Sequence, residues 1–319
     1  MSTNITKQAD EIFPFIDATQ QNCITNEQAQ FFRDNGLLII RNVLRGEELQ
    51  SLREQTSKLV ELAMTTDDAP DTAYSAHEIS GERVPHRVEY VIDKTVAGKA
   101  LLGHPFILKS VELLQGRNFV PTWDSMVFKR EGAGVAVPWH RDGGTNGMED
   151  ALAGRPIFNV DFYLDHSDIT NCLWGIPGSN RWTPQEAGAK CRTLNTDGFQ
   201  TEGAIPILMN PGDVIFHNVL ALHGSPPAQS KLRRVLYYEF RPGEVEREVG
   251  PHTLEYIPLK QKVLLACLRQ RAQTPAAADE ERFEYRPDEE FAPPPLGADE
   301  ELETYRYPHE KFWRDGTRG

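Results

Sequence analysis

The chain has few cysteines and no motif that pairs them. Its four cysteines are widely separated, and none belongs to a Cys-x-x-Cys pair: Cys23, Cys172, Cys191 and Cys267. Closely spaced cysteine pairs are the usual signature of structural zinc sites, and an even set of cysteines in a short secreted chain indicates a disulfide framework. The spacing in these 319 residues therefore predicts free thiols and argues against both classes.

Long apolar runs are also missing. No stretch of the chain approaches the roughly 18 consecutive apolar residues that a membrane-spanning helix needs. The first ten residues are polar and lack the pattern of a secretory signal peptide. We therefore expect a soluble, cytoplasmic protein that makes no contact with a membrane.

Positive charge is scarce. The chain has 34 Lys and Arg against 47 Asp and Glu, a net charge of -13, and residues 275–319 alone contribute -7 of it. A protein that binds nucleic acid needs a basic patch for the phosphates, and none stands out in this sequence. We therefore expect no nucleic-acid partner.

The first part of the chain has the periodicity of helices. Thr25 and Gln28 form a capping-box pattern, and Gly36 follows at the position of a helix stop. Similar signals predict helices over residues 25–36, 47–64, 105–114 and 259–273. Residues 67–85 have the composition of a loop, and 89–92 form a possible short strand.

From residue 122 onward the pattern changes to short strands separated by turn signals. With one earlier strand over 37–43, the expected strands cover residues 125–130, 136–142, 158–164, 205–209, 214–217, 221–223 and 234–240. Many short strands of this kind are typical of a jelly roll or a related β fold. We therefore predict a mainly β protein with flanking helices.

The length favours one catalytic domain with extensions. We place this domain at residues 1–274, with a helical N-terminal part at about 25–116 and a β core at about 122–242. Residues 275–319 form an acidic, proline-containing extension, a composition typical of a disordered tail. The extension is nevertheless rich in aromatic side chains, which contribute most when buried. Two alternatives remain open: disorder, or packing on the body or on a neighbouring subunit of a homo-oligomer.

The segment His140-Arg141-Asp142 carries the strongest chemical signal. Because side chains alternate along a strand, His140 and Asp142 point to one face and Arg141 to the other. A second histidine far downstream, His223, is well placed to complete a set of three ligands. Two histidines and one carboxylate form the facial triad of non-haem Fe(II) oxygenases.

Two further residues compete for roles near this set. His217 lies six residues before His223 and is the main alternative for the distal ligand. Arg234 begins an apolar strand, where a buried guanidinium needs an anion, and a carboxylate is its natural bidentate partner. Its neighbour Arg233 is the rival for this role, but the two residues point to opposite faces, so only one can enter the pocket. The simpler interpretation of Arg233 is a solvated charge.

With these residues in place, the chain resembles the phytanoyl-CoA dioxygenase family of Fe(II)- and 2-oxoglutarate-dependent oxygenases over roughly residues 25–242. The matching elements are His140-x-Asp142, Asn171 to Trp174, Pro177-Gly178-Ser179, Gly212-Asp213, and His223-Gly224-Ser225 with Arg234. The resemblance implies a double-stranded β-helix of the jelly-roll, cupin-like type.

The resemblance also implies roles for single residues. His140, Asp142 and His223 bind Fe(II) and are the catalytic centre. Arg234 and Ser225 hold the distal carboxylate of 2-oxoglutarate, and Met126 lies on a strand that lines the cosubstrate pocket. Trp174 is our candidate for a residue beside the substrate. The glycine-containing segment 143–156 has the composition of a lid and, equally, of a plain surface loop.

The expected function is hydroxylation, or another oxidation, of an unactivated C–H bond in a small organic molecule, a secondary-metabolite intermediate. The reaction consumes dioxygen and releases succinate and CO2. Asp142 favours oxygenation, because halogenating members of the family have a small residue at this position. The alternatives are an acyl-CoA hydroxylase, a cupin-type metal enzyme that does not use 2-oxoglutarate, and a non-enzymatic binding module whose tail docks a partner.

Overall fold

The computed structural model describes residues 9–78, 80–142, 154–228, 231–298, 300 and 312–314. Its core consists of two sheets whose neighbouring strands are all antiparallel. The larger has the order β1-β9-β6-β11-β4-β3-β2 and the smaller the order β5-β10-β7-β8. This arrangement confirms the prediction of a mainly β, double-stranded β-helix fold.

Every strand of the two sheets is short except β4 and β11. The larger sheet consists of β1 Leu37–Ile40, β2 Thr72–Ala76, β3 Arg83–Glu89, β4 Val120–Lys129, β6 Phe158–Tyr163, β9 Val214–Asn218 and β11 Arg233–Arg241. The smaller sheet consists of β5 Val137–His140, β7 Leu173–Gly175, β8 Ile205–Ile207 and β10 His223–Ser225.

The alternation of side chains along β11 divides the core into two layers. Val235 packs between the two sheets, in one cluster with Leu173 of β7 and Ile207 of β8. Leu236 points the other way, into a cluster formed with the helices. Because the side-chain period of a strand is two, the odd-numbered residues of this part of β11 face the barrel interior and the even-numbered residues face the helices.

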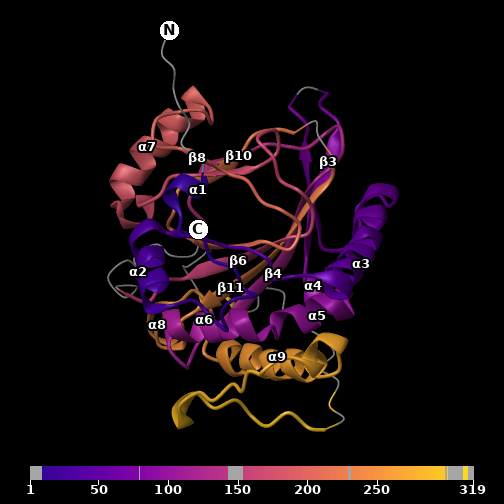
Figure 1. Cartoon of the computed structure of the whole chain (residues 1–319). Helices are drawn as coiled ribbons and strands as arrows, with labels where there is room; N and C mark the ends of the chain where they lie inside the picture. The colour runs from indigo at the N-terminus through magenta and orange to yellow at the C-terminus, as the bar shows by residue number, and fades with distance from the viewer. Residues whose placement is uncertain are drawn as a thin grey trace.

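Helices cover the outer faces of both sheets, and Figure 1 shows α5, α6 and α9 lying together along the larger one. The helices on this side are α2 Asn26–Asn35, α3 Gly46–Thr65, α5 Val96–Leu102, α6 Pro105–Gln115 and α9 Tyr256–Arg271. α7 Pro184–Asp197 covers the smaller sheet, and α1 Ala9–Ile12, α4 Val91–Lys94 and α8 Gly243–Val249 are shorter. Single 3-10 turns occur at η1 Ser179–Arg181, η2 Pro275–Ala278 and η3 Glu289–Phe291.

The local signals in the sequence account for the long helices. The Thr25 side chain accepts from the backbone N–H of Gln28 and the Gln28 side chain accepts from the backbone of Thr25, which is the predicted capping box. Gly36 ends α2 with a φ of 74°, a conformation that favours glycine. The four predicted helices are confirmed as α2, α3, α6 and α9, within a few residues at their ends.

Other local predictions were wrong. Residues 67–85, expected to be a loop, contain β2 and the first part of β3, and 89–92 contain the end of β3 and the start of α4 rather than a strand of their own. The β2 and β3 hairpin has few apolar residues, and pairing with β4 holds it in the sheet. α7 was missed because only Ala187 and Leu194 are buried along it, too few for a clear helical period.

The extension after residue 274 packs on the body of the chain. The side chains of Phe283, Tyr285 and Phe291 are buried, and Figure 1 shows this segment running along the side of α9 away from the sheet. Of the alternatives left open by the sequence, packing on the body holds for this part of the extension. Tyr305 and Tyr307 lie outside the described residues, and a homo-oligomer formed through the extension stays a prediction.

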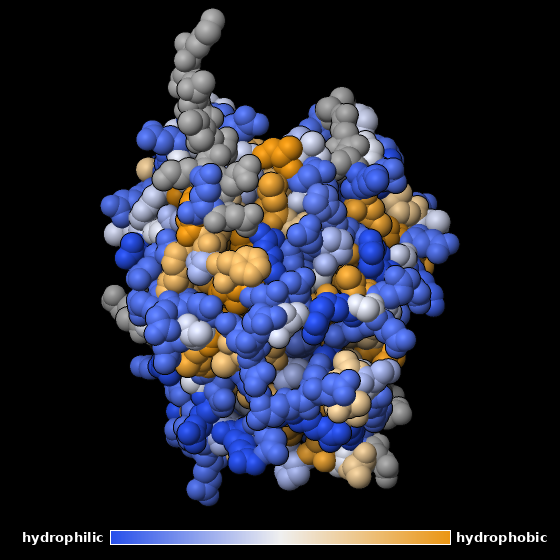
Figure 2. Space-filling model, viewed as in Figure 1, coloured by the Kyte–Doolittle hydropathy of each residue, from blue (hydrophilic) through white to orange (hydrophobic). Residues whose placement is uncertain are grey.

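The surface in view is mainly hydrophilic, with apolar residues interspersed (Figure 2). None of the described helices combines the length and the apolar character that crossing a membrane requires.

Candidate metal centre

Strands β5 and β10 bring His140 and His223 together. The two residues are paired across the strands, and their ring centroids lie 4.2 Å apart. Asp142 follows the end of β5, where its backbone N–H donates to the Val219 carbonyl at 2.9 Å. Its Oδ1 atom lies 3.5 Å from Nε2 of His140 and 3.7 Å from Nε2 of His223. The structure therefore brings together the three predicted ligands, which we call the triad.

The predicted strand 136–142 is shorter in the structure, since β5 ends at His140. Asp142 thus reaches the triad from the loop that follows β5 and not from the strand itself. Its position is fixed by the contact with Val219 and by Asn159 of β6, whose side-chain amide donates to Oδ2 at 3.0 Å. The His-x-Asp spacing predicted this proximity, whereas nothing in the sequence marked Asn159.

The hydrogen bonds of the two imidazoles orient their free nitrogens toward Asp142. Nδ1 of His140 lies 2.8 Å from the Pro138 carbonyl, and Nδ1 of His223 lies 3.0 Å from the Ala221 carbonyl. A carbonyl only accepts, so we assign the ring proton to Nδ1 in both residues. The lone pair of each ring is then on Nε2, the atom that faces the Asp142 carboxylate, as in a metal-binding histidine.

The charges at the triad suit a metal ion. Burial raises the pKa of Asp142, but the neighbouring His223, His140 and His217 outweigh this effect and hold that pKa below its usual range. Burial, assisted by the nearby histidines, keeps the pKa of His223 well below its usual value. The triad therefore offers a carboxylate and a neutral imidazole, the protonation states that metal binding requires.

His217 lies behind the triad. Its Nε2 atom is 3.0 Å from Nδ1 of His223, and its Nδ1 atom is 3.3 Å from Oδ2 of Asp161. Both side chains are fully buried, and burial raises the pKa of Asp161 to about 6. His217 thus contacts His223 at Nδ1, and its Nε2 atom also lies 3.7 Å from Oδ2 of the second ligand, Asp142. Sequence reasoning considered His217 only as a rival ligand and gave Asp161 no role.

Arg234 is not near the triad in the structure. It lies on the helical face of β11, where Nε and Nη2 donate to the two carboxylate oxygens of Asp165 at 2.7 and 2.8 Å. Its Nη1 atom donates to the Arg53 carbonyl and to the Ser57 hydroxyl of α3, both at 2.7 Å. Asp165 therefore supplies the carboxylate that the sequence led us to expect from a cosubstrate.

Arg233 occupies the inner face of β11, and the interpretation of this residue as a solvated charge was wrong. Only 2% of its surface is exposed. Its Nη1 atom donates to the Asn171 carbonyl at 2.5 Å, and its Nε atom is buried without a hydrogen-bond partner among the described residues. Burial raises the pKa of Asp161, which contacts His217, and the charge of Arg233 partly opposes this rise. Arg233 lies two residues before Val235, which faces the barrel interior, so Arg233 faces the interior and Arg234 does not.

Of the remaining predicted site residues, one lies near the triad and two point away from the barrel interior. Ser225 lies two residues after His223 on the same face of β10, and its hydroxyl donates to the Cys172 carbonyl at 3.1 Å. Met126 of β4 is paired with Leu236 and packs among the helices. Trp174 packs beneath α7 on the outer face of the smaller sheet. The structure thus places Ser225 near the triad and turns Met126 and Trp174 away from the barrel interior.

The loop expected over the metal centre falls mainly on residues 143–153, which lie outside the described residues. The centre is open to solvent beside His140, whose side chain is 39% exposed, whereas that of His223 is 7% exposed. Within the described residues, the solvent-exposed side of the triad is therefore the side of His140.

The two-sheet barrel and its two-histidine, one-carboxylate centre are the fold and the ligand set that characterise the class of non-haem Fe(II)- and 2-oxoglutarate-dependent oxygenases. Within this class the chain belongs to the phytanoyl-CoA dioxygenase (PhyH) family, whose family profile matches residues 32–235.

Individual relatives are distant. The peroxisomal phytanoyl-CoA dioxygenase of Homo sapiens is 23% identical over 227 residues, which cover 64% of each of the two chains. A probable alpha-ketoglutarate-dependent hypophosphite dioxygenase of Stutzerimonas stutzeri is 27% identical over 237 residues, covering 65% of this chain and 75% of that protein. The chain therefore spans less than two thirds of the human relative's length.

A similar structure has been solved for EctD from S. alaskensis with 2-oxoglutarate and 5-hydroxyectoine. It has a TM-score of 0.55 and 18% sequence identity, covering 73% of this chain and 81% of EctD. At this identity the likeness supports the fold, and the roles of single residues are argued from the geometry of this chain.

Proposed function

We propose that the protein oxidises an unactivated C–H bond of a small organic molecule, using Fe(II), 2-oxoglutarate and dioxygen and releasing succinate and CO2. The observation that carries this proposal is the triad, in which two imidazole Nε2 atoms face one oxygen of Asp142. The family to which the chain belongs supports the same reaction class.

The donor set fits iron. Two neutral nitrogens and one carboxylate oxygen are the ligands that non-haem Fe(II) oxygenases use, and they leave the remaining coordination positions open for cosubstrate and dioxygen. His140, Asp142 and His223 are the residues that would hold the ion. Asp142 also fills the position at which a small residue would leave room for a halide, which supports oxygenation.

The interior of the barrel fits the carboxylate of 2-oxoglutarate. We propose that Arg233, and not Arg234, binds the distal carboxylate, together with Ser225. The Nε atom of Arg233 is buried and without a partner among the described residues, as is the hydroxyl of Tyr163. The contacts of Arg233 with Asn171 and of Ser225 with Cys172 place both polar groups at the same stretch of chain. An anion there would satisfy a buried donor that otherwise costs free energy.

Several residues of the chain have separate roles in the proposed reaction. When bound, the iron and its cosubstrate supply the oxidising power. Asn159 holds the Asp142 carboxylate, and the Pro138 and Ala221 carbonyls hold the proton of each imidazole on Nδ1. Arg233 orients the cosubstrate by a charged contact, which is strong in a buried site. The barrel walls exclude water from the side of His223.

A secondary-metabolite intermediate is the substrate class that we propose. The net charge of -13 is unfavourable for a polyanionic acyl-CoA, because a surface of the same sign slows the approach of such a ligand. The relatives themselves are named for an acyl-CoA and for hypophosphite, so the family holds substrates of different chemistry.

The proposal is tested by adding Fe(II) and 2-oxoglutarate to the protein without oxygen. We expect a weak visible charge-transfer band in the native protein and its loss in His140→Ala. A screen of candidate substrates should then reveal compounds that stimulate succinate release in the presence of oxygen, with acyl-CoA thioesters included in the panel. Absence of the band in the native protein, or an unchanged band in His140→Ala, would contradict the proposed function.

A further inference from the structure

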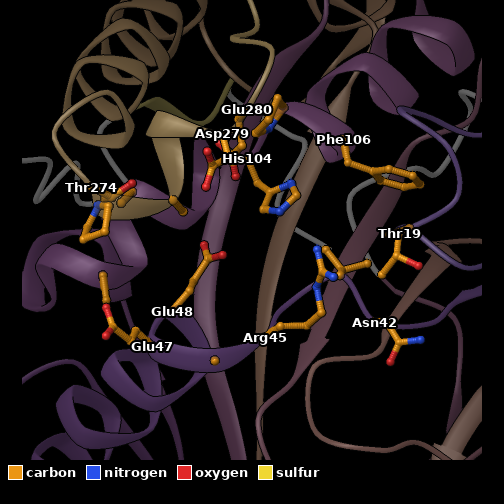
Figure 3. Close-up of a pocket in the computed structure, with 18 of the residues that line it drawn as sticks. Thr19, Asn42, Arg45, Glu47, Glu48, His104, Phe106, Thr274, Asp279 and Glu280 are labelled. Atoms are coloured by element: carbon orange, nitrogen blue, oxygen red, sulfur yellow. The ribbon is translucent and has the colours of Figure 1, made fainter.

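A cavity lies on the helical side of the larger sheet. It has a volume of about 890 Å³ and is lined by the first turn of α3, the start of α6 and the segment around Asp279. In Figure 3 the side chains of Glu48 and His104 point into the same space, with Glu280 beside them. No residue of the triad lines this cavity.

Three potential metal ligands converge at this cavity. Glu48 comes from α3, His104 is the N-cap residue of α6, and Glu280 comes from the C-terminal extension. One donor atom of each side chain lies within 4.8 Å of the donor atoms of the other two. Besides the triad, this is the one such group among the residues that the structure describes.

His104 is the residue that points to a ligand. It is 7% exposed, and its Nδ1 atom is buried without a hydrogen-bond partner among the described residues. Burial, with the charge of Arg271 in addition, lowers the pKa of His104 to about 3, so the ring is neutral at physiological pH. A buried nitrogen without a partner costs free energy, and a metal ion is a partner that neutral imidazole binds well.

The two carboxylates are held in place by Arg271. Arg271 donates to both oxygens of each carboxylate: Nη1 and Nη2 contact Glu48, and Nε and Nη2 contact Glu280. An ionised carboxylate has about four lone-pair sites, so both groups retain acceptor capacity for a further partner. Metal-ligating carboxylates are commonly oriented by such hydrogen bonds from outside the ligand set.

The charge around the cavity favours a cation. Two basic residues, Arg45 and Lys109, line the cavity. The acidic residues that line it are more numerous: Glu47, Glu48, Asp279, Glu280 and Glu281. Even with Arg271 included, carboxylates outnumber the basic groups, and the local potential attracts positive ions.

We propose that Glu48, His104 and Glu280 form a second metal site, separate from the triad, for a divalent transition-metal ion of the Zn²⁺ type. One nitrogen and two carboxylate oxygens, with water completing the shell, are ligands that Zn²⁺ accepts. Because the three residues come from α3, α6 and the extension, the bound ion fastens the C-terminal extension to the helical layer.

The test uses full-length protein in which the triad is disabled by His140→Ala with Asp142→Ala. After treatment with a chelator, Zn²⁺ binding is measured by competition with a chromophoric chelator. We expect one saturable equivalent, and a further Glu280→Gln substitution should weaken its affinity at least about tenfold. Zn²⁺ should also raise the melting temperature of the background protein and not that of the Glu280→Gln protein.

Glu281→Gln is the matched control, since Glu281 pairs with Lys109 and its side chain is 73% exposed. Because Lys109 and solvent already offset the charge of Glu281, the Zn²⁺ affinity of this variant should stay close to that of the background protein. His104→Gln removes the proposed nitrogen ligand. If this variant of a buried residue does not fold, the Zn²⁺ affinity of the Glu280→Gln protein alone tests the site. Lack of saturable Zn²⁺ binding, or equal affinity with and without Glu280→Gln, would overturn the proposal.

Discussion

The Nε2 atom of His217 lies 3.0 Å from Nδ1 of His223 and 3.7 Å from Oδ2 of Asp142. If His223 binds metal through Nε2, its Nδ1 proton is shared between two acceptors, the Ala221 carbonyl and Nε2 of His217. His217 then donates its own Nδ1 proton to Asp161. This chain of contacts orients the ligand and increases its basicity, as partners behind a metal-binding histidine generally do.

Replacing His217 by alanine should therefore weaken Fe(II) binding by about 10-fold to 100-fold. The measurement is a competition between the protein and an Fe(II) chelator under anaerobic conditions. His217→Gln keeps a side-chain acceptor and should recover most of the affinity. Equal affinities of the native and His217→Ala proteins would show that the contact is only structural.

Arg233 and Arg234 should respond differently to substitution, because they lie on opposite faces of β11. Arg233→Gln should raise the apparent KM for 2-oxoglutarate by about 10-fold to 100-fold, the effect of losing a charged hydrogen bond. The folded state should remain close to native in stability, and steady-state kinetics with varied 2-oxoglutarate provide the measurement.

Arg234→Gln is the companion variant. It removes the buried bidentate partner of Asp165 and leaves only the partly exposed Arg53, at 3.2 Å, so we expect a loss of about 3 kcal/mol of unfolding free energy, the lower end for a broken buried ion pair. Protein that still folds should retain the native KM for 2-oxoglutarate. If Arg234→Gln raised the KM and Arg233→Gln did not, the proposed anchor would return to Arg234.

Much of the fold and the ligand set could be predicted from local sequence patterns. The choice between Arg233 and Arg234 could not, because it depends on contacts that are distant in sequence. The capping box at Thr25 and the His-x-Asp spacing act over a few residues, so the sequence displays them directly. The choice between Arg233 and Arg234 depends on which face of β11 meets the smaller sheet. That choice is made by the partners Asp165 and Asn171, which are distant in sequence.

The sequence also showed no sign of the contacts that polar strand residues make across the sheet. The β2 and β3 hairpin has the composition of a loop, and only its register with β4 makes it part of the sheet. Asp161 and Asn159 were treated as ordinary strand residues, because a polar side chain inside a strand has no local signal for its partner. Tertiary pairing determined these positions, as it commonly overrides local propensity.

The C-terminal extension should contribute to stability through Tyr285. Its ring packs 5.1 Å from that of Phe119, and its hydroxyl donates to the Phe119 carbonyl and accepts from Gln261. Tyr285→Ala should lower the unfolding free energy by about 3 kcal/mol, and Tyr285→Phe by about 1 kcal/mol. Urea denaturation measures both. The exposed neighbour variant Arg286→Ala should change stability little, and a Tyr285→Ala protein as stable as native would show that the extension is not anchored here.

Asp93 of α4 should make stability depend on pH. Both of its carboxylate oxygens are buried without a hydrogen-bond partner among the described residues, and burial, with the charge of Asp124, raises its pKa to about 7. Between the unfolded pKa near 4 and this value, the folded state binds the proton more tightly than the unfolded state does. The contribution of Asp93 to the unfolding free energy should therefore decrease as pH rises through this window.

Asp93→Asn removes this titration and keeps the shape of the side chain. The unfolding free energy of the variant minus that of the native protein should increase from about pH 5 to about pH 8, because only the native protein must ionise a buried carboxyl. Urea denaturation at several pH values provides the measurement, with the exposed Asp67→Asn as control. A difference that stays constant over this range, or that decreases, would show that Asp93 is already ionised in the folded protein and that Lys94 and Lys260 compensate for its burial.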